Sequence, residues 1–271
     1  MKALSAARAS MFLSLLPGSV TVAACYAIGT LAMCGLAFLG RPWTAIFLWP
    51  ALSLAVVTVA YCGAGAKVFR KKEGYLPLSG RILLAPYLFG QQLSLAYYRR
   101  QCRPWDVVIP GVWMGRKLTD KEAAEALRHG VTSVLDLTAE FSESSPFLEI
   151  TRRHIPILDL TGPTQNQLRE AVAFIAEQSN RGTVYVHCKV GYSRSAAVLG
   201  AYLLANGFAT TVEAAVDRLR LARPSLVVRR EAWKAMREFA ALSSPALTEP
   251  RAAQRAKNSL QSHTAWPQPR S

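Results

Sequence analysis

Two long stretches of this chain contain no charged residue. The first runs from residue 9 to residue 40 and the second from 42 to 66, with Arg41 alone between them. Each exceeds the roughly 20 residues that a helix needs to cross the core of a bilayer. The sequence therefore predicts an N-terminal transmembrane helical hairpin, with a first span over residues 19–39, a turn over residues 40–43 and a second span directly after it.

Basic residues flank these stretches and are scarce between them. Residues 1–103 carry 11 Lys and Arg against one acidic residue, whereas residues 104–241 carry 17 against 15. Because the cytoplasmic flanks of membrane helices are enriched in Lys and Arg, both ends of the hairpin are expected in the cytoplasm. The excess charge belongs to this segment, so no nucleic-acid partner is expected. The flanking residues are Lys2, Arg8, Lys67, Arg70, Lys71 and Lys72.

Three alternatives to this topology remain open. The hairpin could be the buried core of a soluble protein, although the rest of the chain is short for covering it. Residues 22–24 resemble a lipoprotein cleavage site before Cys25, although the apolar run continues well beyond that cysteine. Residues 82–98 are also uncharged, but they contain Pro86 and Gly90 and are short for a span, so an interfacial helix is favoured over a third crossing.

The rest of the chain alternates short β-branched runs with amphipathic helical patterns, which predicts an α/β domain over residues 104–242. Strands are expected at residues 112–114, 131–137, 154–158 and 183–187. Helices are expected after Thr119, Thr164 and Thr210, each with Glu or Gln three residues later, and at residues 195–205 and 230–242. The predicted organisation is an anchor (1–72), an interfacial segment (73–103), this domain, and a disordered tail (243–271).

The sequence HCKVGYSRS at residues 187–195 joins the last of these strands to a helix. Backbone N–H groups and a helix N-terminus at such a junction form a cradle for a tetrahedral oxyanion. Five residues separate Cys188 from Arg194, so the loop can curl until the guanidinium faces the sulfur across the anion, and Gly191 supplies the backbone freedom for this curl. These surroundings lower the pKa of a thiol, so Cys188 is predicted to be a nucleophilic thiolate.

This stretch resembles the phosphate-binding loop of Cys-dependent phosphatases, in particular the dual-specificity branch with a Ser after the Arg. Together with DLTGPT at residues 159–164, it is similar to the branch that contains the mitochondrial phosphatidylglycerophosphate phosphatases and their bacterial relatives. The resemblance implies an α/β fold with a central, mostly parallel sheet flanked by helices. It implies catalytic roles for Cys188 and Arg194, with Ser195 donating to the departing sulfur. The other phosphate-binding residues are expected to be His187, Lys189, Val190, Gly191, Tyr192 and Ser193.

A carboxylic acid upstream of this loop is needed to protonate the leaving oxygen. Asp159 is the favoured candidate, because it opens a loop that contains Gly and Pro and lies 29 residues before Cys188, as the resemblance implies. Asp136 is the rival, but its place in or just after the central strand favours a structural role. Residues 137–143 lie where the related phosphatases have an acidic, aromatic loop near the active-site mouth, and Glu140 is carried over from that resemblance.

The sequence thus predicts a membrane-anchored phosphatase that hydrolyses phosphomonoesters through a phosphocysteine, without a metal or other cofactor. The anchor favours a phosphorylated lipid headgroup over a phosphoprotein, because it concentrates the site at the membrane. A catalytically silent phosphate-binding module is the alternative, disfavoured by the presence of Cys188, Arg194 and Asp159. A transporter is disfavoured because the predicted spans contain no charge. Richness in Ala and Arg is typical of GC-rich bacteria, so the expected location is a bacterial inner membrane, with the catalytic domain in the cytoplasm.

Overall fold

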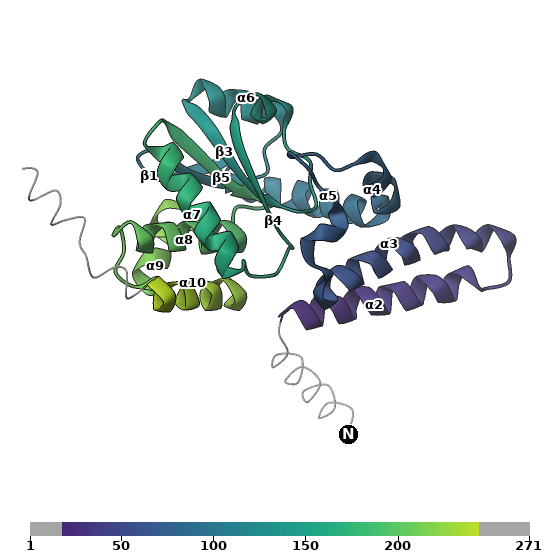
Figure 1. Ribbon diagram of the computed structural model, residues 1–271. Coiled ribbons are helices and arrows are strands. Elements are labelled where there is room, and N and C mark those ends of the chain that lie inside the picture. The colour runs from purple at the N-terminus through teal and green to yellow at the C-terminus, as the bar shows by residue number, and fades with distance from the viewer. Residues whose placement is uncertain (1–17, 244–271) are drawn as a thin grey trace, which may run out of the picture.

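The computed structural model describes residues 18–243. Its N-terminal part is a helical hairpin that projects from a globular body (Figure 1). Helix α2 (Gly18–Ala37) forms one arm, the chain turns at Gly40 with a φ of +79°, and helices η1 (Pro42–Phe47) and α3 (Leu48–Val59) form the other. The predicted hairpin and its turn are therefore present. Lys2, Arg8 and almost all of the predicted tail lie outside the described residues.

The second apolar stretch is not one continuous α-helix. Helix α3 ends at Val59 and is followed by a π-helical turn, η2 (Ala60–Ala64), and a 3-10 turn, η3 (Gly65–Phe69). Gly63 and Gly65 have φ values of +134° and +67°, which residues with a Cβ rarely adopt. These glycines interrupt the regular helix before the end of the uncharged stretch, a break that the composition of the segment did not reveal.

Two further helices lie beside the hairpin, α4 (Leu78–Leu83) and α5 (Ala85–Arg99). Pro86 at the start of α5 separates them, because proline has no N–H with which to continue the hydrogen bonding of α4. The pair lies along α3, where Trp49 Nε1 donates to the carbonyl of Ile82 at 3.0 Å. Among the described residues, two helices are long and apolar enough to cross a membrane, Gly18–Ala37 and Pro42–Phe69, and residues 82–98 are not one of them.

The globular body is built on a five-stranded sheet with the order β1-β2-β5-β3-β4. Strands β1 and β2 are antiparallel and every other neighbouring pair is parallel, so the sheet is mostly parallel, as predicted. The loops that follow β3, β4 and β5 converge at one edge of the sheet, because parallel strands end on the same side. The strands are β1 (Trp105–Ile109), β2 (Val112–Arg116), β3 (Val131–Thr138), β4 (Thr151–Ile157) and β5 (Thr183–Cys188).

Helices cover both faces of the sheet, with α6 on one face and α7 to α10 on the other (Figure 1). Thr119 and Thr164 form the predicted capping boxes at the starts of α6 and α7. The prediction that Thr210 caps α9 was wrong by one residue, because Thr211 accepts the N–H of Ala214. The helices are α6 (Asp120–Arg128), α7 (Gln165–Ser179), α8 (Ser193–Ala205), α9 (Val212–Ala222) and α10 (Arg230–Ser243).

The alternation of side chains along the strands gives each face of the sheet its own core. On β3, Leu135 and Leu137 pack in the cluster formed with α7 to α10, whereas Val134 packs in the cluster formed with α6. Helix α8 lies at the centre of the larger cluster, and its residues from Arg194 to Leu204 are all buried. This packing fixes the start of α8, and with it the loop that precedes the helix.

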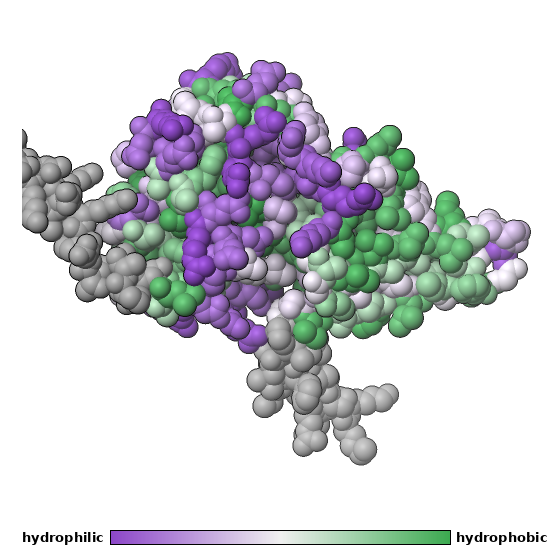
Figure 2. All heavy atoms as spheres, viewed as in Figure 1, coloured by the Kyte–Doolittle hydropathy of each residue, from purple (hydrophilic) through white to green (hydrophobic). Residues whose placement is uncertain are grey.

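The base of the hairpin packs directly on the globular body. A third buried cluster joins side chains of α2, α3 and α5 to Ala139 and Leu158, which lie in the loops after β3 and β4. Away from this base the hairpin is exposed. In the most apolar part of Gly18–Ala37, 6% of the residues are buried, and in the most apolar part of Pro42–Phe69, 28% are buried. Figure 2 shows that the exposed surface is hydrophobic over the hairpin and the neighbouring helices and largely hydrophilic over the globular body.

Candidate active site

The candidate phosphate-binding loop lies between β5, which ends at Cys188, and α8, which begins at Ser193. The loop is folded tightly against the end of β2. Gly191 has a φ of +73°, and a Cβ at this position would lie 2.4 Å from the backbone of Gly115. Any other residue would force the loop away from β2, so the close approach requires glycine.

The Cys188 thiol lies at the base of this loop and the residue is 3% exposed. Burial opposes ionisation, but Arg194, the Ser195 hydroxyl and the backbone amides of Ser195 and Tyr192 outweigh it and lower the pKa of Cys188. The Ser195 hydroxyl is buried and has no other hydrogen-bond partner among the described residues. It is therefore available to stabilise a thiolate at Cys188.

Arg194 is held by acidic groups from two loops. Its guanidinium forms a bidentate ion pair with Glu140 at 2.7 and 3.0 Å and contacts Asp159 at 3.0 Å. It also donates to the carbonyl of Ile157 at 2.9 Å. A planar guanidinium held on one edge by a carboxylate has a fixed orientation, so the acidic loop after β3 orients the arginine toward the cysteine.

Asp159 lies in the loop after β4 and faces the phosphate-binding loop. Its carboxylate accepts hydrogen bonds from Lys189 at 3.2 Å and from Arg194 at 3.0 Å. Burial raises the pKa of Asp159, but these two cations outweigh it and the net pKa is lowered. A phosphate dianion bound to Arg194 and Lys189 would offset their charge and raise the pKa of Asp159, as a general acid requires.

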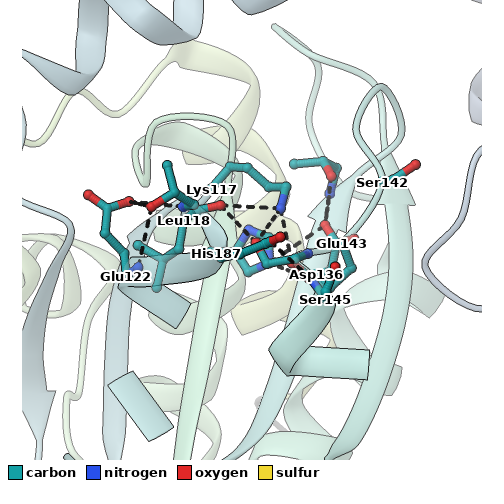
Figure 3. A network of polar contacts seen from close by, with 12 residues as sticks. Lys117, Leu118, Glu122, Asp136, Ser142, Glu143, Ser145 and His187 are labelled. Carbon is teal, nitrogen blue, oxygen red and sulfur yellow. Dashed lines mark hydrogen bonds and ion pairs between the residues drawn. The ribbon is translucent and has the colours of Figure 1, made fainter. Parts of the chain in front are cut away.

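Asp136 lies in a separate, buried polar network (Figure 3). Its carboxylate accepts from Lys71 at 2.5 Å and from the backbone N–H and hydroxyl of Thr138. In the same network, His187 Nε2 contacts Glu143 at 2.7 Å. Burial lowers the pKa of His187, but Glu143 outweighs it and raises this pKa. These contacts favour a structural role for Asp136 and explain how His187 supports the base of the loop.

Three members of this network could together hold a metal ion, since ligand atoms of Asp136, Glu143 and His187 lie within 4.8 Å of one another. Lys71 and Lys117 already form ion pairs with the two carboxylates. A divalent ion would have to displace buried ammonium groups that balance the charge of the cluster. We therefore assign the cluster a structural role.

The remaining residues of the loop are fixed by partners that the sequence patterns did not reveal, because each partner is distant along the chain. One of these partners had a signal in the sequence, because Gln91 is a polar residue within an apolar segment. In the structure Gln91 is buried, with 9% of the residue exposed. Arg223 is fully buried and pairs with Asp106. The contacts are Lys189 Nζ to Gln91 at 2.7 Å, Arg223 to the Val190 carbonyl at 3.0 Å, the Tyr192 hydroxyl with Cys102 at 2.9 Å, and the Arg229 N–H to the Ser193 hydroxyl at 2.9 Å.

A cysteine of lowered pKa at the base of an anion cradle, with an arginine and a carboxylic acid beside it, is the arrangement of a Cys-dependent phosphatase. The sequence supports this class, since residues 112–241 match the dual specificity phosphatase catalytic domain. Phosphatidylglycerophosphate phosphatase PTPMT2 of Arabidopsis thaliana is 31% identical over 190 residues, which cover 68% of this chain and 82% of the relative. The chain therefore belongs to the dual-specificity phosphatase family, in the branch of the phosphatidylglycerophosphate phosphatases, which confirms the resemblance.

Two further comparisons are more distant. Phosphatidylglycerophosphate phosphatase PTPMT1 of Arabidopsis thaliana is 28% identical over 144 residues, and these cover 51% of this chain and 42% of that relative, so the chain spans less than half of its length. The crystal structure of Tk-PTP in its active form is similar with a TM-score of 0.47 and 26% identity, covering 51% of this chain and 97% of that one.

Proposed function

We propose that this phosphatase is anchored in a membrane and hydrolyses a lipid phosphate at the cytoplasmic face through a phosphocysteine. The observation that carries the proposed chemistry is the buried Cys188, whose pKa is lowered chiefly by Arg194. In this proposal residues 1–72 are the anchor, residues 73–103 lie at the membrane interface, and residues 104–242 carry out catalysis. Nine of the ten residues of the predicted site are the continuous stretch 187–195, and the tenth, Asp159, is the general acid in this proposal.

The proposed reaction has two steps. First, the Cys188 thiolate attacks phosphorus while the P–O bond to the leaving group breaks, and protonated Asp159 gives its proton to the leaving oxygen. Second, water attacks the phosphocysteine, the P–S bond breaks, and the Asp159 carboxylate takes a proton from the water. Arg194 and the loop amides bind the phosphoryl oxygens in both steps, and Ser195 donates a hydrogen bond to the departing thiolate.

Membrane anchoring is supported by the hairpin's exposed apolar surface. A core helix of a soluble protein would bury most of its side chains, whereas 6% of the residues in the most apolar part of α2 are buried. The free energy of exposing such a surface to water is large, about 25 cal/mol for each Å². The cytoplasmic orientation is supported by Lys67, Arg70, Lys71 and Lys72, which follow the second stretch, against Arg41 in the turn.

A lipid substrate is supported by a cleft beside the site. The cleft has a volume of about 1210 Å³ and is lined by apolar side chains of α4 and α5, including Ile82, Leu88 and Phe89, and by charged residues that include Glu140. Glu140 also holds Arg194, so one residue connects the cleft to the loop where the phosphate would bind. Apolar substrate groups would be buried there, and the similarity to PTPMT2 favours the same class of substrate.

The nucleophile is tested in the full chain reconstituted in phospholipid vesicles. We expect Cys188→Ser to lower phosphate release from phosphatidylglycerophosphate by at least about a thousandfold, because serine is not ionised at neutral pH. Binding of vanadate should persist, since the loop amides and Arg194 remain. Cys62→Ser is the matched control, because Cys62 is exposed in the hairpin segment. Activity of Cys188→Ser within about tenfold of the parent protein would contradict the mechanism.

The substrate class is tested with the same vesicles. We expect faster turnover of phosphatidylglycerophosphate in the bilayer than of a phosphotyrosine peptide at equal concentration, and inhibition by vanadate but not by EDTA. Preference for the peptide would indicate phosphoproteins as the substrates instead. Vanadate binding without turnover of either compound would favour a silent phosphate-binding module.

A further inference from the structure

The end of the hairpin and the helices that follow it contact the carboxyl ends of three parallel strands and the loops after them. These loops follow β3, β4 and β5 and include the candidate acid and the phosphate-binding loop. Apolar packing accompanies the polar contacts, since Tyr61 and Tyr87 are buried in the cluster that contains Ala139 and Leu158. The polar contacts are Lys71 to Asp136 and Thr138, Tyr61 to Asp159, and Gln91 to Lys189.

The Tyr61 contact involves the backbone of the candidate general acid. The Tyr61 hydroxyl donates to the main-chain carbonyl of Asp159 at 2.7 Å. On the other side of the same peptide group, the Leu160 N–H donates to Asp159 Oδ1 at 3.1 Å. Both polar groups of the Asp159–Leu160 peptide are therefore hydrogen-bonded. The carbonyl is bound by Tyr61, and the N–H is bound by the carboxylate that is expected to transfer the proton.

This peptide lies in a turn with an unfavourable backbone conformation. The Thr161 N–H donates to the Leu158 carbonyl at 3.3 Å, so Leu158 to Thr161 form a β-turn. Leu160, its third residue, has a φ of +61°, as in a type II turn, where glycine or asparagine is preferred. A leucine in this conformation costs about 1–2 kcal/mol. Rotation of the central peptide would relieve this cost and would remove the Leu160 N–H from the Asp159 carboxylate.

We propose that Tyr61 is a positioning residue for the general acid, so that the end of the membrane hairpin completes the active site. The inference rests on the proposed function of Asp159. The Tyr61 hydroxyl opposes rotation of the Asp159–Leu160 peptide, and the Leu160 N–H then holds the carboxylate where Lys189 and Arg194 contact it. Tyr61 is 7% exposed, so water does not readily replace its hydrogen bond.

The variant Tyr61→Phe tests this role in the full chain, reconstituted in vesicles. We expect kcat/KM for an alkyl phosphate, whose leaving group needs a proton, to fall roughly tenfold to a hundredfold, because a small misplacement of a catalytic group has an effect of this size. For p-nitrophenyl phosphate, whose leaving group departs without a proton, kcat/KM should stay within about twofold, because this ratio covers the steps up to formation of the phosphocysteine and not its hydrolysis. Tyr97→Phe is the matched control, since Tyr97 is 61% exposed on α5 and should behave as the parent protein.

A double-mutant cycle separates positioning from a general loss of structure. In an Asp159→Asn background, Tyr61→Phe should cause no further loss on the alkyl phosphate, because the group through which it acts has been removed. Additive losses, or equal losses on both substrates, would overturn the proposal. The proposed function itself would be contradicted by a separate result, namely phosphatase activity that survives Cys188→Ser.

Amide hydrogen exchange gives a readout that needs no turnover. The Leu160 N–H should exchange faster in Tyr61→Phe than in the parent protein, whereas amides in α8 should be unchanged. Unchanged exchange at Leu160 would overturn the proposal even if activity fell. Faster exchange throughout the protein would also count against it, because it would show that Tyr61 supports the fold rather than this turn.

Discussion

At the scale of single residues, the proposed chemistry depends on two pKa values that are shifted in the same direction. Arg194 contributes to lowering the pKa of both Cys188 and Asp159, against the opposing effect of burial. A lowered pKa favours the nucleophile, which must be ionised, but disfavours the acid, which must be protonated. In the proposed mechanism the active form combines a thiolate with a protonated carboxyl, and we expect its population to be greatest on the acidic side of neutrality.

The variant Asp159→Asn tests the acid. The acid must be protonated, so kcat/KM of the parent protein should fall as pH rises above the pKa of Asp159, and this decline should be absent in Asp159→Asn. The variant should lose about 10² to 10⁴ in rate on alkyl phosphates and less on activated aryl phosphates. The measurement is the pH dependence of kcat/KM for both substrates. An equal loss on both, with the decline retained, would indicate a structural Asp159, and Asp136→Asn would then be compared.

At the scale of the elements, the end of β3 is joined to the segment after the hairpin by a buried ion pair. The side chains of Lys71 and Asp136 are 1% and 4% exposed. Burial raises the pKa of Asp136, but Lys71 and the neighbouring histidines outweigh it and hold the pKa well below its usual value. The stabilisation by this carboxylate is therefore present above the unfolded pKa, about 3.9, and is lost as the pH falls.

Removing the cation from this pair should destabilise the protein strongly. We expect Lys71→Met to lower the free energy of unfolding by about 3–5 kcal/mol at pH 7, because Asp136 is left charged and buried without its partner. Lys72→Met is the matched control, since Lys72 is exposed, and it should stay within about 0.5 kcal/mol of the parent protein. Denaturant unfolding in detergent micelles measures both variants. Equal stabilities would show that Lys71 is not the partner that Asp136 requires.

At the scale of the whole molecule, a hydrophobic hairpin and a hydrophilic catalytic body are joined at the candidate active site. The surface of Figure 2 is hydrophobic over the hairpin and the adjoining helices and mostly hydrophilic elsewhere. The buried cluster at the base of the hairpin contains residues from both parts. The orientation of the hairpin in a membrane would therefore fix the compartment in which the thiolate works.

The orientation is tested by reporter fusions at Ser243. We expect fluorescence from a reporter active only in the cytoplasm, and no signal from one active only after export, because more basic residues follow the second span than lie in the turn. A reducing cytoplasm would keep Cys188 as a thiolate, whereas export would favour its oxidation. A signal from the exported reporter would contradict the two-span topology and favour a third crossing at residues 82–98 or cleavage before Cys25.

Much of the catalytic fold and the loop could be predicted because their signals are local. The apolar, β-branched run of β3, the capping boxes at Thr119 and Thr164, and the spacing of Cys188, Gly191 and Arg194 each depend on neighbouring residues. A loop between a strand and a buried helix has few conformations, so its motif is sufficient to indicate an anion cradle. The start of α9 was missed by one residue because Thr210 and Thr211 offer the same hydroxyl, and only the backbone decides between them.

The partners of the site were decided by tertiary structure. Sequence alone determined that an apolar hairpin precedes a phosphatase domain, since uncharged length and motif spacing are properties of continuous segments. The pairing of Arg194 with Glu140, of Lys71 with Asp136 and of Tyr61 with Asp159 joins residues 54, 65 and 98 positions apart. Such pairs form only when the parallel strands end at one edge of the sheet and the hairpin's base packs against that edge. No local pattern carries this information, because it arises from the order of the strands and the packing of the whole chain.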